Sequence, residues 1–226
     1  MAGTKKKIKI ALLGYGKMGK EIDSLCRESE HFEVVSISFR KKEDSLDLAG
    51  IRGADVAIDF TSKDVVLKNA EEVAKLGKNL VIGTTGWYNE LKIVENLAKK
   101  YKIGVLYSPN FSIGANIFFK TMAFANKLFS KFSEYDVYGL EVHHKAKLDS
   151  PSGTALKIAS LVDGLNFSSI RAGRNPGFHE VTFDSQADSV SFSHQAHNRT
   201  GFAQGALVAA EFIKNKKGLY TFDDAL

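Results

Sequence analysis

The chain has 226 residues with a formal net charge of +5, and 44% of the residues are hydrophobic. This length suits one large domain or two small ones, and the hydrophobic fraction is sufficient for a buried core, which excludes a disordered chain. The run Lys5 to Lys7 stands at the N-terminus, so the rest of the chain is only mildly basic, which disfavours a nucleic-acid-binding surface and suits anionic small molecules.

Cysteine content and hydropathy bear on the compartment. Cys26 is the only cysteine, which excludes a disulfide framework and a cysteine-built zinc site and fits a reducing compartment. No apolar run is long enough to span a bilayer, and the opening residues lack the apolar core and cleavage site of a signal peptide. We therefore expect a cytoplasmic protein that binds neither membrane nor nucleic acid.

The first hundred residues alternate short apolar runs with amphipathic stretches, the pattern of a parallel sheet with crossover helices. Strands are predicted at 7–14, 32–39, 55–60, 79–85 and 103–108. Helices are predicted at 17–29, 62–76 and 88–101, where apolar residues recur at helical spacing. This part of the chain is predicted to be an α/β domain.

The pattern changes after the segment SPNFSIGAN. A long apolar helix is predicted at about 114–132, followed by the strand YDVYGLEVHH, a helix at 152–164 and the alternating strands FHEVTFD and SVSFSHQ. Strands separated from helices indicate a second, α+β domain with an open mixed sheet. The last predicted helix, 202–214, is apolar on one face and is expected to pack on the first domain. We predict a first domain of residues 1–110 and 200–226, and a second of residues 111–199.

A glycine turn follows the first predicted strand. Gly14, Gly16 and Gly19 form G-x-G-x-x-G between a strand and a helix. In a dinucleotide-binding fold the first glycine makes the tight turn, the second lets the pyrophosphate approach the backbone, and the third lets the helix pack on the strand. The pyrophosphate then lies at the helix N-terminus. A purely structural glycine turn is the alternative, but the order of strand, glycines and helix favours cofactor binding.

The tip of the second predicted strand bears on the choice between NAD and NADP. An acid there would accept hydrogen bonds from the ribose hydroxyls, whereas a base accommodates a 2′-phosphate. Arg40, Lys41 and Lys42 come first at this tip, with no acid before them. A solvated charge run is the alternative interpretation. We predict that NADPH is preferred and that NADH is the second cofactor.

Three polar turns follow other strands of the same sheet: 59–64, 83–87 and 108–112. They are expected at the carboxyl ends of the strands, where this fold binds its cofactor. Thr84 and Thr85 could instead, or in addition, cap the next helix.

The segment EVHHKAKLDSPSGTA, residues 141–155, places two histidines at a strand end before a helix start. Ser152 can cap the helix, and the backbone N–H groups of Gly153 and Thr154 would then face an anion such as a carboxylate. Lys147 is placed to meet the same anion, and Asp149 could orient that lysine.

The histidines of this segment have less specific interpretations as well. His143 and His144 point to opposite sides of an extended strand, which predicts different roles. Adjacent histidines that diverge make a poor zinc site, and His179, His194 and His197 lie in another segment, so no metal is expected. Structural histidines and solvent-exposed lysines remain the alternative to a catalytic role.

With these motifs the chain resembles the 4-hydroxy-tetrahydrodipicolinate reductase family, also called dihydrodipicolinate reductase, of bacterial lysine and diaminopimelate synthesis. The resemblance runs nearly end to end, through GYGKMG, IDFT, VIGTTG, SPNFSIGAN, EVHHKAKLDSPSGTA, RAG, FAQGA and GLYTFDDAL. The block E-x-H-H-x-x-K-x-D-x-P-S-G-T-A is far more specific than the glycine turn. The resemblance implies a Rossmann-type dinucleotide-binding domain and a second domain that binds the substrate and forms a homotetramer.

The resemblance also implies residue roles. His143 matches the family's proton donor or acceptor and Lys147 its second proton donor, and the small dicarboxylate substrate would contact His144, Ser152, Gly153 and Thr154. The implied cofactor residues are Gly14, Tyr15, Gly16, Lys17, Met18, Gly19, Arg40, Lys41, Thr61, Gly83, Thr84, Thr85, Ser108, Pro109, Asn110 and Phe111. The expected reaction is the NAD(P)H-dependent reduction of 4-hydroxy-tetrahydrodipicolinate, via dihydrodipicolinate, to tetrahydrodipicolinate. Two alternatives stay open: another two-domain NAD(P)-dependent dehydrogenase, and a dinucleotide sensor without turnover.

Overall fold

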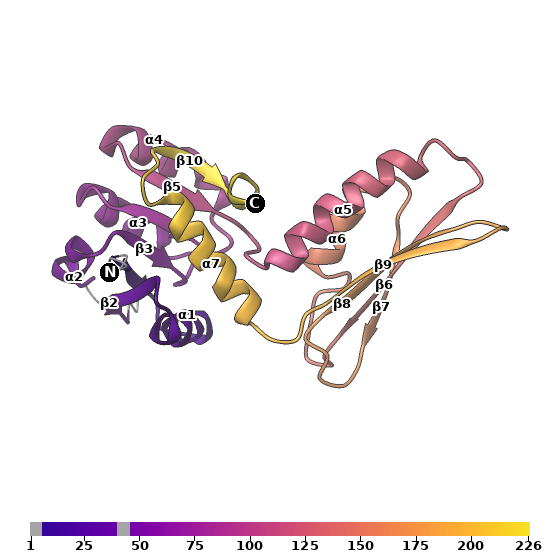
Figure 1. Ribbon diagram of the computed structural model, residues 1–226, viewed down its shortest axis with the longest axis horizontal. Coiled ribbons are helices and arrows are strands. Elements are labelled where there is room, and N and C mark those ends of the chain that lie inside the picture. Colours follow the sequence, from indigo (N-terminus) through magenta and orange to yellow (C-terminus); the bar gives the residue numbers. More distant parts are fainter. Residues whose placement is uncertain (1–5, 40–45) are drawn as a thin grey trace, which may run out of the picture. The chain divides into compact units, whose positions relative to one another are not determined.

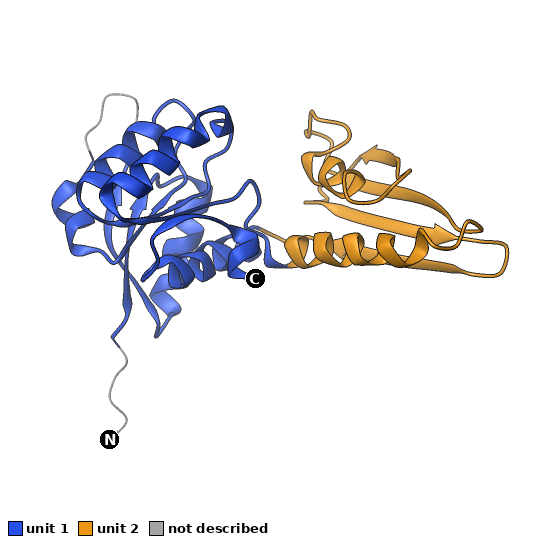
Figure 2. Cartoon of the chain, turned by 90° about the horizontal axis from the view of Figure 1, so that it is seen from above, with its two compact units in different colours: residues 1–113, 199–226 blue, residues 114–198 orange. Residues whose placement is uncertain are grey.

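The computed structural model describes residues 6–39 and 46–226. The chain forms two compact units, the first of Met1–Ile113 with Arg199–Leu226 and the second of Gly114–Asn198 (Figure 2). Both boundaries lie within about three residues of the predicted ones. Cofactor binding by the first unit and substrate binding by the second stay predictions.

The first unit is built on a parallel six-stranded sheet in the order β10-β5-β4-β3-β1-β2 (Figure 1). Its strands are β1 Ile8–Leu13, β2 Phe32–Ser38, β3 Val56–Asp59, β4 Asn79–Ile82, β5 Gly104–Tyr107 and β10 Gly218–Thr221. The helices are α1 Lys17–Glu28, α2 Leu48–Gly53, α3 Val66–Lys75, α4 Leu91–Tyr101 and α7 Thr200–Ile213, and the 3₁₀ turns are η1 Tyr88–Glu90 and η2 Phe222–Ala225.

Both faces of this sheet are buried. Successive side chains of each strand point to opposite faces, so alternate residues of one strand belong to different cores. On β1, Ala11 and Leu13 join a core cluster with residues of α3 and α4, whereas Ile10 and Leu12 join a second cluster with residues of α1 and α7. The last long helix thus packs on the first unit, as its apolar face predicted. Helices on both faces and a parallel sheet between them give the predicted α/β architecture.

Two elements of the first unit were not predicted. Strand β10 has only four residues and adds to the sheet edge beside β5. Helix α2 has six residues and begins at the N-cap Asp47, whose side chain accepts a hydrogen bond from the Gly50 N–H. In β10 (GLYT) only two consecutive residues are apolar, whereas the equally short β3, β4 and β5 each have three. The six residues of α2 (LAGIRG) include two glycines. Neither segment therefore gives a clear pattern.

The second unit carries a four-stranded mixed sheet in the order β7-β6-β8-β9. Its elements are α5 Ile113–Phe129, β6 Asp136–His143, α6 Gly153–Ala159, β7 Phe167–Arg171, β8 Phe178–Asp184 and β9 Ser189–Gln195. Strand β7 was not predicted. It pairs parallel with β6, whereas β6 with β8 and β8 with β9 pair antiparallel.

One face of this second sheet is covered by α5 and α6. Phe118 and Met122 of α5 and Ile158 of α6 form a core with Val181 and Phe183 of β8. Apolar side chains are also exposed on the sheet strands, with Tyr138 52% and Ile170 45% exposed. The sheet is therefore open, as predicted. Among the described residues, no helix combines the length and the apolar character that crossing a membrane requires.

Candidate active site

The glycine turn of the first unit has the geometry that a dinucleotide requires. Gly14 has φ +90°, and a Cβ atom there would lie 2.5 Å from the carbonyl oxygen of Phe60. A Cβ on Gly16 would meet nothing within 4 Å, so the backbone at the start of α1 is open to a ligand. A Cβ on Gly19 would collide with the Gly14 carbonyl oxygen. The three glycines thus permit a tight turn at Gly14, leave open space at Gly16 and allow close packing at Gly19.

A pocket of about 400 Å³ opens at the carboxyl ends of β1, β3 and β4. It is lined by Gly16, Lys17, Met18, Phe60, Thr61, Ser62, Lys63, Gly83, Thr84 and Thr85. Seven of these ten were predicted as cofactor residues, and the other three belong to the polar turn 59–64 or its flank. Helix α1 begins here at the N-cap Gly16, with no side-chain cap and no acid in its first turn, which leaves a positive helix end for an anion.

Several other predicted cofactor residues do not line this pocket. Phe111 is 2% exposed and packs in the core of the first unit, with its ring centroid 6.0 Å from that of Phe60 and 5.1 Å from that of Phe222. Ser108 is buried, and its hydroxyl donates to the carbonyl of Asn110. Neither these residues nor Pro109 line the pocket. Arg40 and Lys41 fall outside the described residues.

Asp59, at the end of β3, ties the pocket walls together. Its buried carboxylate accepts hydrogen bonds from Thr61 N–H (2.9 Å) and Oγ1 (2.7 Å), Asn69 Nδ2 (2.7 Å) and Thr84 Oγ1 (2.7 Å). Burial raises the pKa of Asp59, and the same hydrogen bonds oppose that rise. The Thr84 hydroxyl is therefore used by Asp59, and η1 and α4 have no side-chain N-cap.

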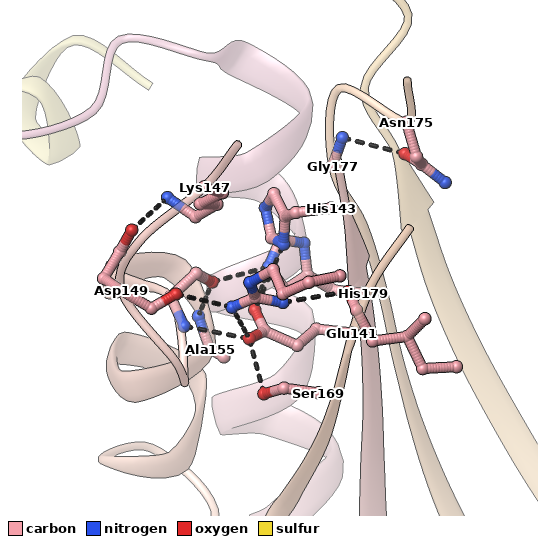
Figure 3. A network of polar contacts seen from close by, with 12 residues as sticks. Glu141, His143, Lys147, Asp149, Ala155, Ser169, Asn175, Gly177 and His179 are labelled. Atoms are coloured by element: carbon pink, nitrogen blue, oxygen red, sulfur yellow. Dashed lines mark hydrogen bonds and ion pairs between the residues drawn. The ribbon is translucent and has the colours of Figure 1, made fainter. Parts of the chain in front are cut away.

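A second polar cluster is centred on β6 in the second unit (Figure 3). Glu141 and His143 are two residues apart on β6 and therefore share a face of the sheet. The strand register places Ser169 of β7 and His179 of β8 directly beside Glu141, and Arg171 beside His143. Five polar side chains from three strands thus meet on one face.

The carboxylate of Glu141 is fully buried and strongly hydrogen-bonded. Its Oε1 accepts from the Ser152 N–H (3.0 Å), from Ser169 Oγ (2.7 Å) and from Arg171 Nη2 (2.7 Å). Burial alone would raise the pKa of Glu141, but the hydrogen bonds from Ser152, Arg171 and Ser169 lower it to about 2. Glu141 is therefore a charged group at neutral pH, balanced by the Arg171 guanidinium.

The two histidines face the other oxygen of the same carboxylate. His143 Nδ1 and His179 Nε2 each lie 3.4 Å from Glu141 Oε2, and His179 Nε2 is 3.1 Å from Ser152 Oγ. The side chains of His143 and His179 are 7% and 4% exposed, respectively. Burial lowers the pKa of His143 and lowers that of His179 to about 4. Both rings are consequently neutral at pH 7.

The position of His179 corrects one premise of the sequence analysis. Glu141, His143 and His179 bring three possible metal-ligand atoms within 4.8 Å of one another, so His179 is not remote from His143. A signal existed: His179 precedes Val181 and Phe183 at spacing two, which places it on the covered face of β8. The absence of a metal stays a prediction.

The loop between β6 and α6 presents Lys147. Its Nζ lies 2.8 Å from Asp149 Oδ1, and the hydrogen bond from Lys147 lowers the pKa of Asp149. Arg171 Nη2 donates to the Asp149 carbonyl at 2.6 Å, which anchors the loop to β7. Ser152 caps α6 as predicted, because its Oγ accepts from the Ala155 N–H. Lys147 and the helix start therefore lie on the same short segment as His143.

Comparison with known proteins identifies the family. Residues 8–111 match the family model "Dihydrodipicolinate reductase, N-terminus" and residues 114–226 match "Dihydrodipicolinate reductase, C-terminus". The chain belongs to the dihydrodipicolinate reductase family. It is thus an oxidoreductase of lysine and diaminopimelate biosynthesis, and its first unit is the family's NAD(P)-binding domain. The predicted fold class and family are confirmed.

Individual relatives align with this chain over nearly their whole length. The 4-hydroxy-tetrahydrodipicolinate reductase of Christiangramia forsetii is 35% identical, with 96% of this chain and 97% of the relative covered. That of Thermosipho africanus is 36% identical, with 97% and 98% covered. Among solved structures, the dipicolinate-bound dihydrodipicolinate reductase of Paenisporosarcina sp. TG-14 matches with a TM-score of 0.81 at 25% identity, covering 98% of this chain and 100% of that one.

Proposed function

We propose that this enzyme reduces 4-hydroxy-tetrahydrodipicolinate, via dihydrodipicolinate, to tetrahydrodipicolinate, with NADPH preferred over NADH. The names of the relatives support the substrate, and the dipicolinate bound to the Paenisporosarcina enzyme supports a small ring with two carboxylates. The observation that carries the proposal is the position of His143 beside a buried carboxylate, on the same segment as Lys147 and the start of α6.

The first unit fits the cofactor. The open space at Gly16 and the uncapped start of α1 suit a pyrophosphate. Lys17, Thr61 and Thr84 line the pocket beside it. When bound, the nicotinamide supplies the hydride that is added to ring carbon 4 of the substrate.

The second unit supplies the proton chemistry. Hydride addition to the ring leaves an enamine that must be protonated. His143 delivers that proton from its imidazolium form, which the negative charge of the bound dicarboxylate favours although burial lowers the pKa of His143 in the free protein. Lys147 holds one substrate carboxylate, together with the N–H groups of Gly153 and Thr154, and assists proton delivery. His144 and Ser152 complete the substrate contacts. Such positioning can contribute several kcal/mol to catalysis.

Substitution of His143 and Lys147 tests these roles. His143→Ala should lower kcat by roughly a hundredfold or more with little change in KM, as expected for the loss of a general acid. Lys147→Ala should lower kcat and raise KM together, because positioning and proton delivery share one contact. Lys145→Ala, which removes an exposed lysine of the same loop, is the matched control. A destabilised but fully active His143→Ala enzyme would falsify the assignment.

The same assay tests the substrate. NADPH oxidation is followed with substrate generated in situ from pyruvate and aspartate semialdehyde. Turnover is expected with this substrate. No turnover by folded enzyme that still binds NADPH would favour the alternative of a two-domain dehydrogenase for another imine or an aldehyde.

The proposed NADPH preference rests on the sequence that follows β2, in which Arg40 and Lys41 come before any acidic residue. The kcat/KM for NADPH should exceed that for NADH, and Arg40→Ala and Lys41→Ala should reduce the difference. Lys75→Ala removes a surface lysine of α3 that pairs with Glu71 and is the control. Equal kcat/KM values for the two cofactors in the parent enzyme would contradict the proposal.

The open sheet of the second unit is proposed to mediate a homotetramer. Tyr138 and Ile170 leave apolar area exposed on this sheet, and a symmetric partner would bury it. Light scattering coupled to size exclusion should report four chains, and Tyr138→Lys should yield smaller species. A monomeric parent protein at micromolar concentration would exclude this assembly.

A further inference from the structure

Glu141 uses its two carboxylate oxygens differently. Three donors, from Ser152, Ser169 and Arg171, saturate Oε1 at 2.7 to 3.0 Å. Oε2 is buried and, within the described residues, has no hydrogen bond of its own. The nitrogens nearest to it are those of His143 and His179, both at 3.4 Å. An ionised oxygen in such surroundings requires N–H groups, because an imidazole lone pair facing it would be repelled.

The two nitrogens of His143 are also unequal. Nδ1 is buried without a hydrogen-bond partner in the described part of the chain, and it faces Glu141. Nε2 points toward Gly177, where a Cβ atom would lie 3.1 Å away. Gly177 has φ +153° and adds no side chain beside Nε2. The ring therefore faces a carboxylate at Nδ1 and a glycine at Nε2.

The balance of charge between Glu141 and Arg171 supports a fixed arrangement of the side chains around Glu141. Arg171 neutralises Glu141 through Oε1, so the carboxylate stays ionised although it is fully buried. His179, on the neighbouring strand β8, occupies the remaining space at Oε2 and contacts Ser152, the cap of α6. The cluster thus links the His143 ring to the helix start that is proposed to bind the substrate carboxylate.

We infer that Glu141 is a positioning residue for His143: its Oε2 accepts the Nδ1–H of His143, which fixes the tautomer and leaves Nε2 to carry the proton to and from the substrate. This inference rests on the proposed role of His143 as the proton donor. The distance of 3.4 Å is long for a hydrogen bond, and such contacts commonly tighten when the ligand binds and the imidazole becomes charged. His179 Nε2, also 3.4 Å from Oε2, is the second nitrogen that can donate to this oxygen.

Nuclear magnetic resonance tests the tautomer without turnover. In two-bond ¹H–¹⁵N spectra of the free, full-length protein at pH 7.5, His143 should show the neutral Nδ1–H form, assigned by loss of its signals in His143→Gln. Free histidine favours Nε2–H, so the Nδ1–H form requires an acceptor at Nδ1. An Nε2–H signal for His143 would overturn the inference.

Kinetics provide the second test. In Glu141→Gln the amide can donate to Nδ1 and select the opposite tautomer, so kcat should fall at least about tenfold while NADPH affinity is unchanged. The alkaline limb of the kcat profile should move to lower pH, because the lost negative charge no longer stabilises the imidazolium. Thr182→Val, which removes the partly buried hydrogen bond between Thr182 of β8 and Ser191 of β9, is the stability control. It should lower the melting temperature and leave the pH profile in place.

The outcomes separate the inference from the proposed function. An inactive His143→Gln enzyme together with a folded Glu141→Gln enzyme of parental pH profile overturns only the positioning role. A fully active His143→Gln enzyme overturns the proton-donor role, whatever the spectrum shows. Stoichiometric zinc in the purified protein that is lost in His179→Ala would also overturn the inference, since a metal at this cluster would replace the Nδ1 proton.

Discussion

Protonation of His179 should destabilise the second unit in weak acid. Burial lowers the pKa of His179 from 6.5 to about 4, so between these values the unfolded chain binds a proton that the folded unit does not. The stability from the neutral ring is therefore present above pH 6.5 and is lost as the pH falls toward 4. At 1.36 kcal/mol per pKa unit, the loss is about 2 kcal/mol between pH 7 and pH 5 and about 3 kcal/mol by pH 4.

Hydrogen exchange of β6 and β8 amides measures this loss within the second unit alone. Exchange rates at pH 7 and pH 5, corrected for the intrinsic pH dependence, give the opening free energy. The parent protein should lose about 2 kcal/mol or more between the two pH values, because His143 and His194, whose pKa values burial also lowers, add to the His179 contribution. His179→Gln should lose clearly less. His31→Gln, an exposed histidine of the first unit, is the control and should behave like the parent.

An equal pH dependence in His179→Gln and the parent would refute the assignment of the acid sensitivity to His179. Glu141 cannot mimic the effect, because its pKa is lowered from 4.5 to about 2. Its contribution is present above pH 4.5 and is lost only at lower pH. The two groups thus act in successive pH windows.

Three substitutions test other parts of the site. Asp59→Ala leaves the donors of Thr61, Asn69 and Thr84 unpaired, so it should lower the free energy of unfolding by about 3 kcal/mol or more. Urea unfolding followed by Trp87 fluorescence measures this loss, and NADPH binding should weaken as well. Gly14→Ala should lower the free energy of unfolding by about 1 to 3 kcal/mol, through backbone strain and the contact of the added Cβ with Phe60. Gly53→Ala is the control: its Cβ would meet nothing within 4 Å, so neither the free energy of unfolding nor NADPH affinity should change. Gly177→Ala should lower kcat without weakening NADPH binding, because its Cβ would crowd His143 Nε2; unchanged turnover would show that the ring has another orientation.

Sequence patterns were sufficient for most elements of this fold. They located β1 to β5 and the longer helices to within a few residues, because these strands carry apolar residues in runs or in alternation and these helices span several turns. They missed β7, whose five residues FSSIR include three polar ones, β10, which has only two consecutive apolar residues, and α2, whose six residues include two glycines. For these elements the structure is decided by the neighbours on which they pack, which a local pattern does not reveal.

The candidate site likewise contains residues that the sequence reveals and residues that only the structure reveals. His143 and Lys147 stand in a specific motif and could be found from the sequence. Ser169, Arg171 and His179 lie up to 38 positions from Glu141 in the chain and reach it only through the register of β6 with β7 and β8. Asp59 was not predicted for a similar reason, since the hydroxyl of Thr84 reaches it from the turn after the neighbouring strand β4.

The charges of the second unit imply that substrate binding takes up a proton. In the free protein Glu141 is balanced by Arg171, Lys147 is paired with Asp149, and the two buried histidines are neutral. A dicarboxylate brings two negative charges, of which Lys147 can meet one if it leaves Asp149. The second charge favours the imidazolium form of His143, whose pKa should therefore rise on binding. Calorimetric titration of the enzyme–NADPH complex with dipicolinate at pH 7.5 should show net proton uptake, read from the dependence of the heat on the buffer's ionisation enthalpy. His143→Gln should abolish the uptake, and a parent enzyme that binds dipicolinate with no uptake would show that His143 does not respond to the substrate's charge.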